Sequence, residues 1–233
     1  MSWLLPPTVS TFGEDIDRIY YIILWITGIV FVLTEVTLVY FLVKYRHREG
    51  HKAEYIHGNV KAEVIWTVIP AVIVISIALM SKGVWAEIRD PALIPDGAVE
   101  VIVTAKQFEW NVTYAGLDGR LGTGDDFDVR NQLHVPVDRA VVVHLRSEDV
   151  IHSFFLPDMR VKQDAVPGME TPVWFEATQT GEYPLACAEL CGLGHYTMDA
   201  RLTVHSQSEF NDWQAQQTAQ ATGGAQVGVP GGF

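Results

Sequence analysis

Both cysteines of this 233-residue chain lie in one short stretch, CAELCGLGHYTM, residues 187–198. Cys187 and Cys191 are separated by three residues, and His195 and Met198 follow closely. These side chains could form a small disulfide loop, a redox dithiol, part of a zinc site or part of a copper site. A disulfide over so short a loop stabilises little, because its entropic benefit grows with loop length. A redox dithiol normally has two residues between its cysteines, not three.

Copper suits this donor set better than zinc does. Zinc prefers four nitrogen or sulfur donors, and methionine is a poor ligand for it. Thiolate, imidazole and a weak axial thioether are the usual donors of copper electron-transfer sites. A mononuclear site of this type needs one cysteine, whereas two cysteines allow both sulfurs to bridge two metal ions. Each of these ions then needs a histidine of its own.

The second histidine must come from elsewhere in the chain, and the candidates are His134, His144, His152 and His205. His144 and His205 lie within strand patterns and are typical of ordinary sheet residues, and His134 is ambiguous. His152 lies in EDVIHSFFLP, residues 148–157, at the end of a predicted strand and before a turn. We therefore expect His152 to be the second histidine ligand.

Two apolar blocks near the start of the chain predict a membrane hairpin. Residues 19–43 contain one charged side chain, Glu35, and at about 1.5 Å per residue they can cross a hydrocarbon core about 30 Å thick. Residues 64–80 are uncharged and extend to Trp85 if Lys82 reaches the interface. Pro70 is tolerated in such a helix. A buried core helix is the alternative, but two such blocks fit poorly inside a small domain. An acid in a membrane helix is costly, so we expect Glu35 to contact a polar group of another helix.

The charges between the two blocks set the expected orientation. The segment between them carries five basic residues, Lys44, Arg46, Arg48, Lys52 and Lys61, which the positive-inside rule places in the cytoplasm. We expect no removable signal peptide, so the first helix must serve as the signal. The expected organisation is a periplasmic tail (1–18) and a hairpin (19–86) with a cytoplasmic loop (44–62), in a bacterial inner (plasma) membrane. Both termini then lie outside the cytoplasm.

The pattern of residues 87–210 predicts a β domain. Short runs such as VEVIVT (99–104), AVVVHL (140–145) and RLTVH (201–205) are separated by turn residues, which predicts a sandwich or small barrel. Residues 211–233 are rich in Gly, Ala and Gln, and we expect a flexible tail there. The Asp-rich loop 117–128 does not match the calcium-binding EF-hand spacing. We expect a solvated hairpin insertion.

The net charge of −12 lies entirely in this second part of the chain. From Ala86 onward 21 acidic residues outnumber 9 basic ones. Such a surface is either a solvated face or a means of attracting a basic partner at a salt-dependent rate. It argues against nucleic acid as a ligand.

Across residues 20–210 the chain resembles subunit II of the haem–copper cytochrome c oxidases. The matching segments are EVIWTVIPA (63–71), SEDVIHSFFLP (147–157), VKQDAVPG (161–168) and CAELCGLGHYTM (187–198), the last being the dinuclear CuA motif. The resemblance implies a membrane-anchored all-β protein, in which a two-helix transmembrane hairpin precedes a cupredoxin-like Greek-key β-barrel. It also implies the subunit that accepts electrons in a terminal respiratory oxidase. CuA would take electrons from cytochrome c and pass them to haem in subunit I, where oxygen is reduced and protons are pumped.

The resemblance also assigns the metal ligands. Cys187 and Cys191 would bridge two coppers, and His152 and His195 would bind one copper each. Met198 and the backbone carbonyl of Glu189 would be weak axial ligands. The Glu189 side chain would bind Mg²⁺ or Mn²⁺ at the boundary with subunit I.

Further residues receive roles from the same resemblance. Lys162 and Asp164 would dock onto subunit I. Glu63 matches an acid linked to proton uptake into subunit I, although an acid at a helix start also suits the helix dipole. Where the family typically has tryptophan as the point at which electrons enter, this chain has Phe108, with Trp110 two residues on. That departure leaves the donor open between cytochrome c and a haem c domain of another complex.

Two other protein classes share parts of this pattern. One is the CuA-containing subunit of a nitric oxide reductase. The other is a membrane-anchored copper-delivery protein, which has a thioredoxin-like fold, one membrane helix and no counterpart of His195 or Met198. The chain has no C-x-x-C-H haem attachment motif. Haem therefore belongs to partner subunits only.

Overall fold

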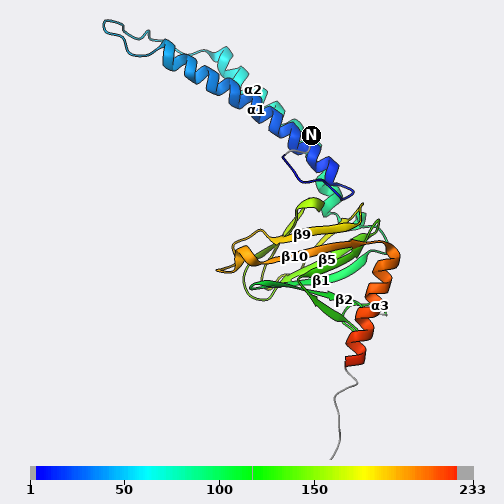
Figure 1. Cartoon of the computed structure of the whole chain (residues 1–233). Helices are drawn as coiled ribbons and strands as arrows, with labels where there is room; N and C mark the ends of the chain where they lie inside the picture. Colours follow the sequence, from blue (N-terminus) through cyan, green and yellow to red (C-terminus); the bar gives the residue numbers. More distant parts are fainter. Residues whose placement is uncertain (1–3, 117, 225–233) are drawn as a thin grey trace, which may run out of the picture. The chain divides into compact units, whose positions relative to one another are not determined.

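The computed structural model describes residues 4–116 and 118–224. The chain divides into two compact units (Figure 1). One unit is Asp15–Glu87, and the other combines Met1–Glu14 with Ile88–Phe233. The segment before the first long helix therefore belongs to the same unit as the β domain.

Two long apolar helices, α1 (Gly13–Lys44) and α2 (Val60–Arg89), make up most of the first unit. Both are long and apolar enough to cross a membrane, and their apolar windows are exposed to the surroundings. Asn59 caps the start of α2, since its Oδ1 accepts a hydrogen bond from Ala62 N at 3.1 Å. The helix continues through Pro70. The predicted helix pair is confirmed, and both helices extend beyond the apolar blocks.

The first helix begins earlier than the sequence suggested. Residues 13–18, expected to be part of a periplasmic tail, form the first turns of α1. The physical reason is the run Glu14, Asp15 and Asp17, because acidic side chains in a first turn interact favourably with the helix dipole. Ser10 O also accepts a hydrogen bond from Gly13 N at 3.2 Å.

The β domain consists of two five-stranded sheets. The first has the order β3-β2-β1-β5-β8 and the second β4-β10-β9-β6-β7. The strands of the first sheet are β1 (Val99–Lys106), β2 (Glu109–Tyr114), β3 (Phe127–Arg130), β5 (Ala140–Ser147) and β8 (Thr171–Glu176). Those of the second are β4 (Gln132–Pro136), β6 (His152–Leu156), β7 (Val161–Ala165), β9 (Gly181–Cys187) and β10 (Asp199–His205). Short 3₁₀ turns lie at Pro91–Leu93, Pro157–Met159 and His195–Thr197.

The chain passes repeatedly between the sheets, as a Greek-key sandwich requires. β1 pairs parallel with β5 and β10 pairs parallel with β4, while the other pairings are antiparallel. Asn131 makes one crossing, from β3 to β4, in a left-handed conformation (φ 57°) that asparagine tolerates well. Its Oδ1 accepts a hydrogen bond from Trp110 N at 2.8 Å. The predicted hairpin followed by a Greek-key β domain is confirmed.

Alternating side chains fill the space between the sheets. Val101, Val103 and Ala105 of β1 are fully buried. Trp110 from the first sheet meets Phe154 from the second edge to face, with ring centroids 5.8 Å apart. This apolar core is what fixes the strands that carry the metal-binding side chains.

A short N-terminal arm, residues 6–12, adds to this domain. Ser10 forms a β-bridge with Ala177, and Val9 N donates a hydrogen bond to Asp158 O at 2.9 Å. Phe12 is buried and packs edge-on against Trp174 at 5.6 Å. The arm therefore ties the chain ahead of α1 to the β domain.

The C-terminal segment differs from the flexible tail expected at 211–233. Residues Gln207–Gly224 form helix α3, so the prediction is wrong for residues 211–224, and residues 225–233 lie outside the described part. Ser206 and Glu209 form a capping box: Ser206 N donates to the Glu209 carboxylate at 2.9 Å, and Glu209 N donates to the Ser206 hydroxyl oxygen at 3.4 Å. Ala and Gln also favour helix. Among its few large apolar side chains, Trp213 packs against the β domain. Its ring centroid lies 4.9 Å from that of Tyr114 and 4.2 Å from that of His134.

Candidate metal centre

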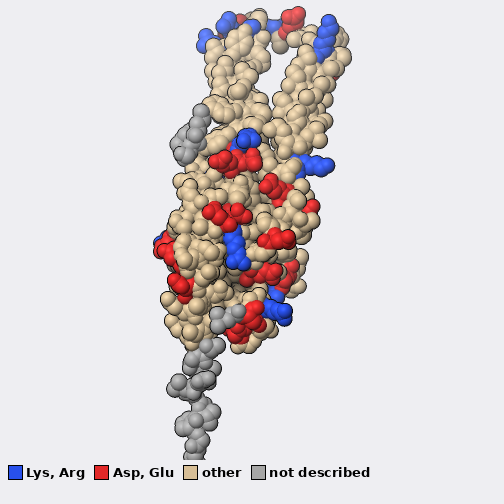
Figure 2. Space-filling view, turned by 90° about the vertical axis from the view of Figure 1, so that its right-hand side faces the viewer, with Lys and Arg blue, Asp and Glu red and all other residues tan. Residues whose placement is uncertain are grey.

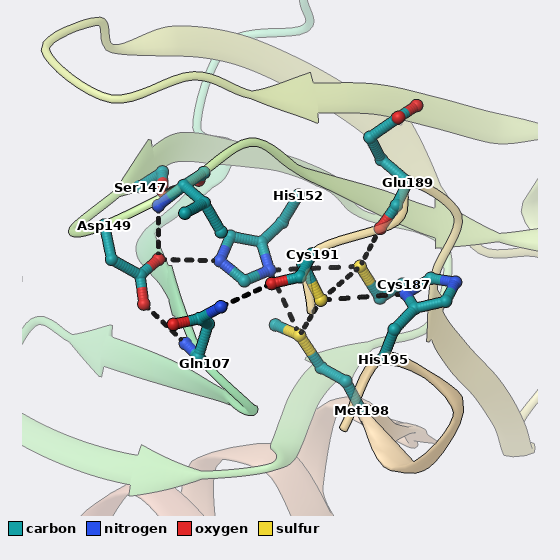
Figure 3. A network of polar contacts seen from close by, with 10 residues as sticks. Gln107, Ser147, Asp149, His152, Cys187, Glu189, Cys191, His195 and Met198 are labelled. Carbon is teal, nitrogen blue, oxygen red and sulfur yellow. Dashed lines mark hydrogen bonds and ion pairs between the residues drawn. The ribbon is translucent and has the colours of Figure 1, made fainter. Parts of the chain in front are cut away.

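Neighbouring strands of the second sheet bring the candidate ligands together (Figure 3). His152 is the first residue of β6 and Cys187 the last of β9, and these strands pair antiparallel with Phe154 opposite Cys187. The chain then turns through residues 188–198 and returns as β10. Cys187 N donates to Met198 O at 3.1 Å, which closes this loop at its base.

The sulfur and imidazole atoms converge on one small volume. The two cysteine Sγ atoms lie 3.9 Å apart, too far for a disulfide bond of about 2.05 Å. His152 Nδ1 is 3.9 Å from Cys187 Sγ, and His195 Nδ1 is 3.6 Å from Cys191 Sγ. Each thiol therefore has an imidazole beside it. Ligand atoms of His152, Cys187 and Cys191 all lie within 4.8 Å of one another, an arrangement that can hold a metal ion.

Two weaker donors complete the set. Met198 Sδ lies 3.7 Å from Cys191 Sγ and 3.2 Å from His152 Nδ1. The backbone oxygen of Glu189 lies 3.2 Å from Cys187 Sγ. Thiols, imidazoles, a thioether and a carbonyl oxygen form a set that fits copper and does not suit the closed tetrahedral sites of zinc.

The site is largely shielded from water. His152 is fully buried, Met198 is 2% exposed and Cys191 is 4% exposed. Burial, followed by the charge of Cys187, raises the pKa of the Cys191 thiol to about 11. A metal ion binds the thiolate form, so metal binding must displace protons from these sulfurs. The apolar surroundings thus make the Cys191 thiol depend on a cation to become charged.

Asp149 orients the buried histidine. Its Oδ1 accepts a hydrogen bond from His152 Nε2 at 2.8 Å, which leaves Nδ1 facing the sulfurs. Burial acts to raise the pKa of the Asp149 carboxyl, but hydrogen bonds from Gln107 N, His152 and Val150 N outweigh it and lower the pKa. The carboxylate is therefore ionised beside the imidazole. Neither Asp149 nor Gln107 was singled out in the sequence. The only signal was an acid three residues before His152.

Phe108 and Trp110 occupy different places. Phe108 is half-buried and lies against the ligand loop: a Cβ added to Gly194 would be 2.5 Å from its ring, and one added to Gly192 3.2 Å. Trp110 is fully buried, with its ring centroid 6.2 Å from that of His152. Trp110 therefore cannot touch a docked protein. On the same ligand loop, Leu193 and Tyr196 are strongly exposed, at 98% and 86%.

The other predicted residues lie outside the sulfur cluster. Glu189 is exposed, and Figure 3 shows its carboxylate pointing away from the sulfurs while its carbonyl oxygen faces Cys187. Lys162 and Asp164 are exposed on β7, opposite Phe155 and Ser153 of β6. Asp164 Oδ1 accepts a hydrogen bond from the Ser153 hydroxyl at 2.7 Å.

Glu63, Glu35 and the Asp-rich loop also lie outside the sulfur cluster. Glu63 lies exposed in the first turn of α2, and Glu35 lies exposed within α1. In the Asp-rich loop, described except for residue 117, carboxylates accept backbone hydrogen bonds: Asp118 from Arg120 N and Asp126 from Gly122 N, at 2.8 and 2.6 Å. Figure 2 shows acidic side chains spread over the visible face of the β domain.

Comparison with known proteins identifies the family. The profile of the cytochrome c oxidase subunit II periplasmic domain matches residues 99–205, and that of its transmembrane domain matches residues 1–84. The chain belongs to the cytochrome c oxidase subunit II family. An alternative cytochrome c oxidase subunit 2 from Bradyrhizobium diazoefficiens is 34% identical over 92% of this chain and 84% of its own length. Cytochrome c oxidase subunit 2 from Synechocystis is 31% identical over 91% of this chain and 75% of its own length.

A solved structure is also similar. The crystal structure of the periplasmic domain of subunit II of cytochrome oxidase from Bradyrhizobium japonicum is 29% identical, with a TM-score of 0.49. It covers 55% of this chain and 98% of that one.

Membership of the cytochrome c oxidase subunit II family settles the general role. The chain is the membrane-anchored, copper-binding subunit through which electrons enter a haem–copper oxidase, and its partners are the other oxidase subunits. It is thus part of an oxidoreductase complex. The nitric oxide reductase and copper-delivery alternatives are not favoured.

Proposed function

We propose that this chain holds a dinuclear copper centre that accepts electrons singly from a c-type haem protein and passes them to haem in subunit I. The observation that carries the proposal is the paired geometry of the donors. Two free thiols lie 3.9 Å apart, with one imidazole beside each. Such a pair suits two copper ions bridged by both sulfurs, with His152 and His195 as terminal ligands. Met198 and the Glu189 carbonyl would be weak axial ligands.

The chain contributes rigidity to this centre. A copper pair held here by Cys187 and Cys191 would share one electron between its two metals, and its bond lengths would change little on reduction. The ligand loop is held by its own hydrogen bonds, from His195 N to Gly192 O at 3.1 Å and from Thr197 N to Gly194 O at 2.9 Å. Ala188 N also donates to Ser153 O of β6 at 3.0 Å. These contacts fix the ligand positions before and after electron transfer.

The outward side of the ligand loop suits contact with subunit I. We propose that the Glu189 carboxylate binds Mg²⁺ or Mn²⁺ at that boundary, while its carbonyl faces the copper pair. Lys162 and Asp164 would lie at the same interface. The hydrogen bonds of Ser153 support a common interface for Glu189 and Asp164. Its hydroxyl donates to Asp164, and its backbone oxygen accepts from Ala188 N, directly before Glu189.

The donor side is formed by the surface over Phe108. Cytochrome c or a haem c domain would contact Phe108, Leu193 and Tyr196, of which the last two are strongly exposed. The net negative charge of the β domain favours a basic donor and a rate that falls as salt is raised. Trp110 would act from inside the core, beside His152, rather than at the surface.

The N-terminal arm supports the proposed topology. Residues 9 and 10 are bonded to the β domain, so the chain before α1 and the chain after α2 belong on one side of the membrane. Two crossings satisfy this requirement. With the basic loop 44–62 in the cytoplasm, the copper domain and both termini are periplasmic. Glu63, in the first turn of α2, then lies at the cytoplasmic end of the hairpin.

Electron paramagnetic resonance of the purified oxidase tests the proposal. The oxidised copper centre should show one unpaired electron shared equally by two copper nuclei. Cys191→Ser should abolish this pattern, because a hydroxyl cannot bridge as a thiolate does. A single-copper spectrum in the unaltered protein, or survival of the two-copper pattern in Cys191→Ser, would refute the proposal.

A further inference from the structure

Gln107 contacts the metal centre without offering it a ligand. It lies in the turn between β1 and β2, directly before Phe108. Its side-chain Nε2 donates a hydrogen bond to Cys191 O at 2.5 Å, and its backbone N donates to Asp149 Oδ2 at 2.8 Å (Figure 3). One residue is therefore bonded to two different segments of the site.

Each of these bonds leads to a different candidate ligand. The Asp149 carboxylate receives Gln107 on one oxygen and His152 Nε2 on the other. The Cys191 carbonyl belongs to a residue whose thiol lies in the donor cluster. Gln107 thus connects the loop before β6 to the loop after β9, although the residues joined are 42 and 84 positions away from it in sequence.

The packing around the turn leaves room for this contact. Gly192 has a φ of +138°, and a Cβ there would lie 2.7 Å from Gln107 Nε2. A side chain at 192 would therefore push the amide away from Cys191. The adjoining Phe108 ring lies over Gly192 and Gly194. The glycines of the ligand loop allow the whole turn to approach closely.

We propose that Gln107 is a positioning residue of the copper centre, which holds the Cys191 segment by its side chain and the His152 imidazole through Asp149. The inference rests on the proposed copper function. Groups that orient metal ligands contribute to metal affinity, typically by about 10- to 100-fold. The amide also points the positive end of its dipole toward Cys191, which favours the reduced, less positive centre.

The test is Gln107→Met in the purified oxidase, with Gln214→Met as the matched control. Both glutamines donate from Nε2 to a backbone oxygen, but Gln214 bonds to Ala115, which is not part of the site. Gln107→Met keeps the backbone bond to Asp149 and removes only the side-chain bond. We expect about tenfold weaker copper binding in competition with a chelator. We also expect a lower reduction potential and altered copper hyperfine splittings, with none of these changes in Gln214→Met.

The proposal is overturned if the two variants give the same copper affinity, potential and spectrum. Gln107→Glu provides a second measurement, because it keeps the shape of the side chain but cannot donate to the Cys191 carbonyl. It should lower the potential further, since a negative charge favours the oxidised centre. If the unaltered oxidase shows no two-copper spectrum, the proposed function fails. If it does and both Gln107 variants match Gln214→Met, only this inference fails.

Discussion

Asp149→Asn is the change that tests most directly how the protein holds its buried histidine. The carboxylate accepts three hydrogen bonds, from His152 Nε2 at 2.8 Å, Gln107 N at 2.8 Å and Val150 N at 2.6 Å. An asparagine of the same shape has one acceptor oxygen. Its NH₂ group must face either the Gln107 amide or the His152 and Val150 donors, so at least one hydrogen bond becomes a donor–donor contact.

The expected loss follows from these contacts. A ligand-orienting group of this kind contributes about 10- to 100-fold to metal affinity, which corresponds to about 1.4 to 2.7 kcal/mol. The variant also removes a negative charge beside His152, because the lowered pKa of Asp149 keeps its carboxylate ionised. Negative charge stabilises the more positive, oxidised centre. Its removal should therefore raise the copper reduction potential, opposite in sign to the effect expected for Gln107→Met.

Copper competition with a chelator and redox titration of the purified oxidase measure both quantities. Glu148→Gln is the control, because it removes the same charge one residue away. Within the described residues, the exposed Glu148 side chain makes no hydrogen bond to a candidate ligand. An unchanged copper affinity in Asp149→Asn, or an equal loss of affinity in Glu148→Gln, would contradict the positioning role of Asp149. An unchanged or lowered potential in Asp149→Asn would contradict the expected effect of its charge.

Three further predictions concern other parts of the chain. Leu193→Asp should raise the KM for the haem donor at least about tenfold while leaving the copper spectrum unchanged. The reason is that the change places a charge at an apolar position that is 98% exposed on the ligand loop. An unchanged KM in steady-state oxidation assays would place donor docking elsewhere. Burial, followed by the neighbouring His205, lowers the pKa of His134 to about 4. The unfolded chain therefore binds a proton that the folded chain does not, and stability should fall by about 3 kcal/mol as the pH drops from about 6.5 to about 4. Urea titrations followed by tryptophan fluorescence at several pH values would show this fall in stability, and His134→Asn should make it smaller. Phe12→Ala should weaken docking of the N-terminal arm by about 3 kcal/mol, and limited proteolysis should then cut the arm faster at neutral pH than in the unaltered protein.

The C-terminal segment and the N-terminal arm show where reading the sequence alone was insufficient. The Ala- and Gln-rich segment after residue 206 has few large apolar side chains, and its composition favoured disorder. Ser206 and Glu209 form a helix-start motif that was present in the sequence. What composition could not reveal was that Trp213 would stack on His134, a residue far away in the chain. The docking of the N-terminal arm could not be predicted for the same reason, because Phe12 packs on Trp174, a residue far away in the chain.

Features that depend on local spacing and composition could be predicted before the fold was known. Two apolar blocks define the membrane helices, because length and hydrophobicity alone decide whether a helix suits a bilayer. Cys187, Cys191, His195 and Met198 lie on one loop, so their common site follows from their positions in the chain. His152 could be selected because a single sequence pattern set it apart from the other histidines.

The way in which these ligands are held became visible only in the folded domain. Gln107, Asp149 and Cys191 come from three separate segments, and no sequence spacing relates a turn after β1 to a carbonyl in the loop after β9. Trp110 likewise proved to be a buried neighbour of His152 rather than a surface aromatic. Hydrogen bonds and packing between distant segments depend on the register of both sheets. That register is fixed by the whole core, and a local pattern of residues does not contain it.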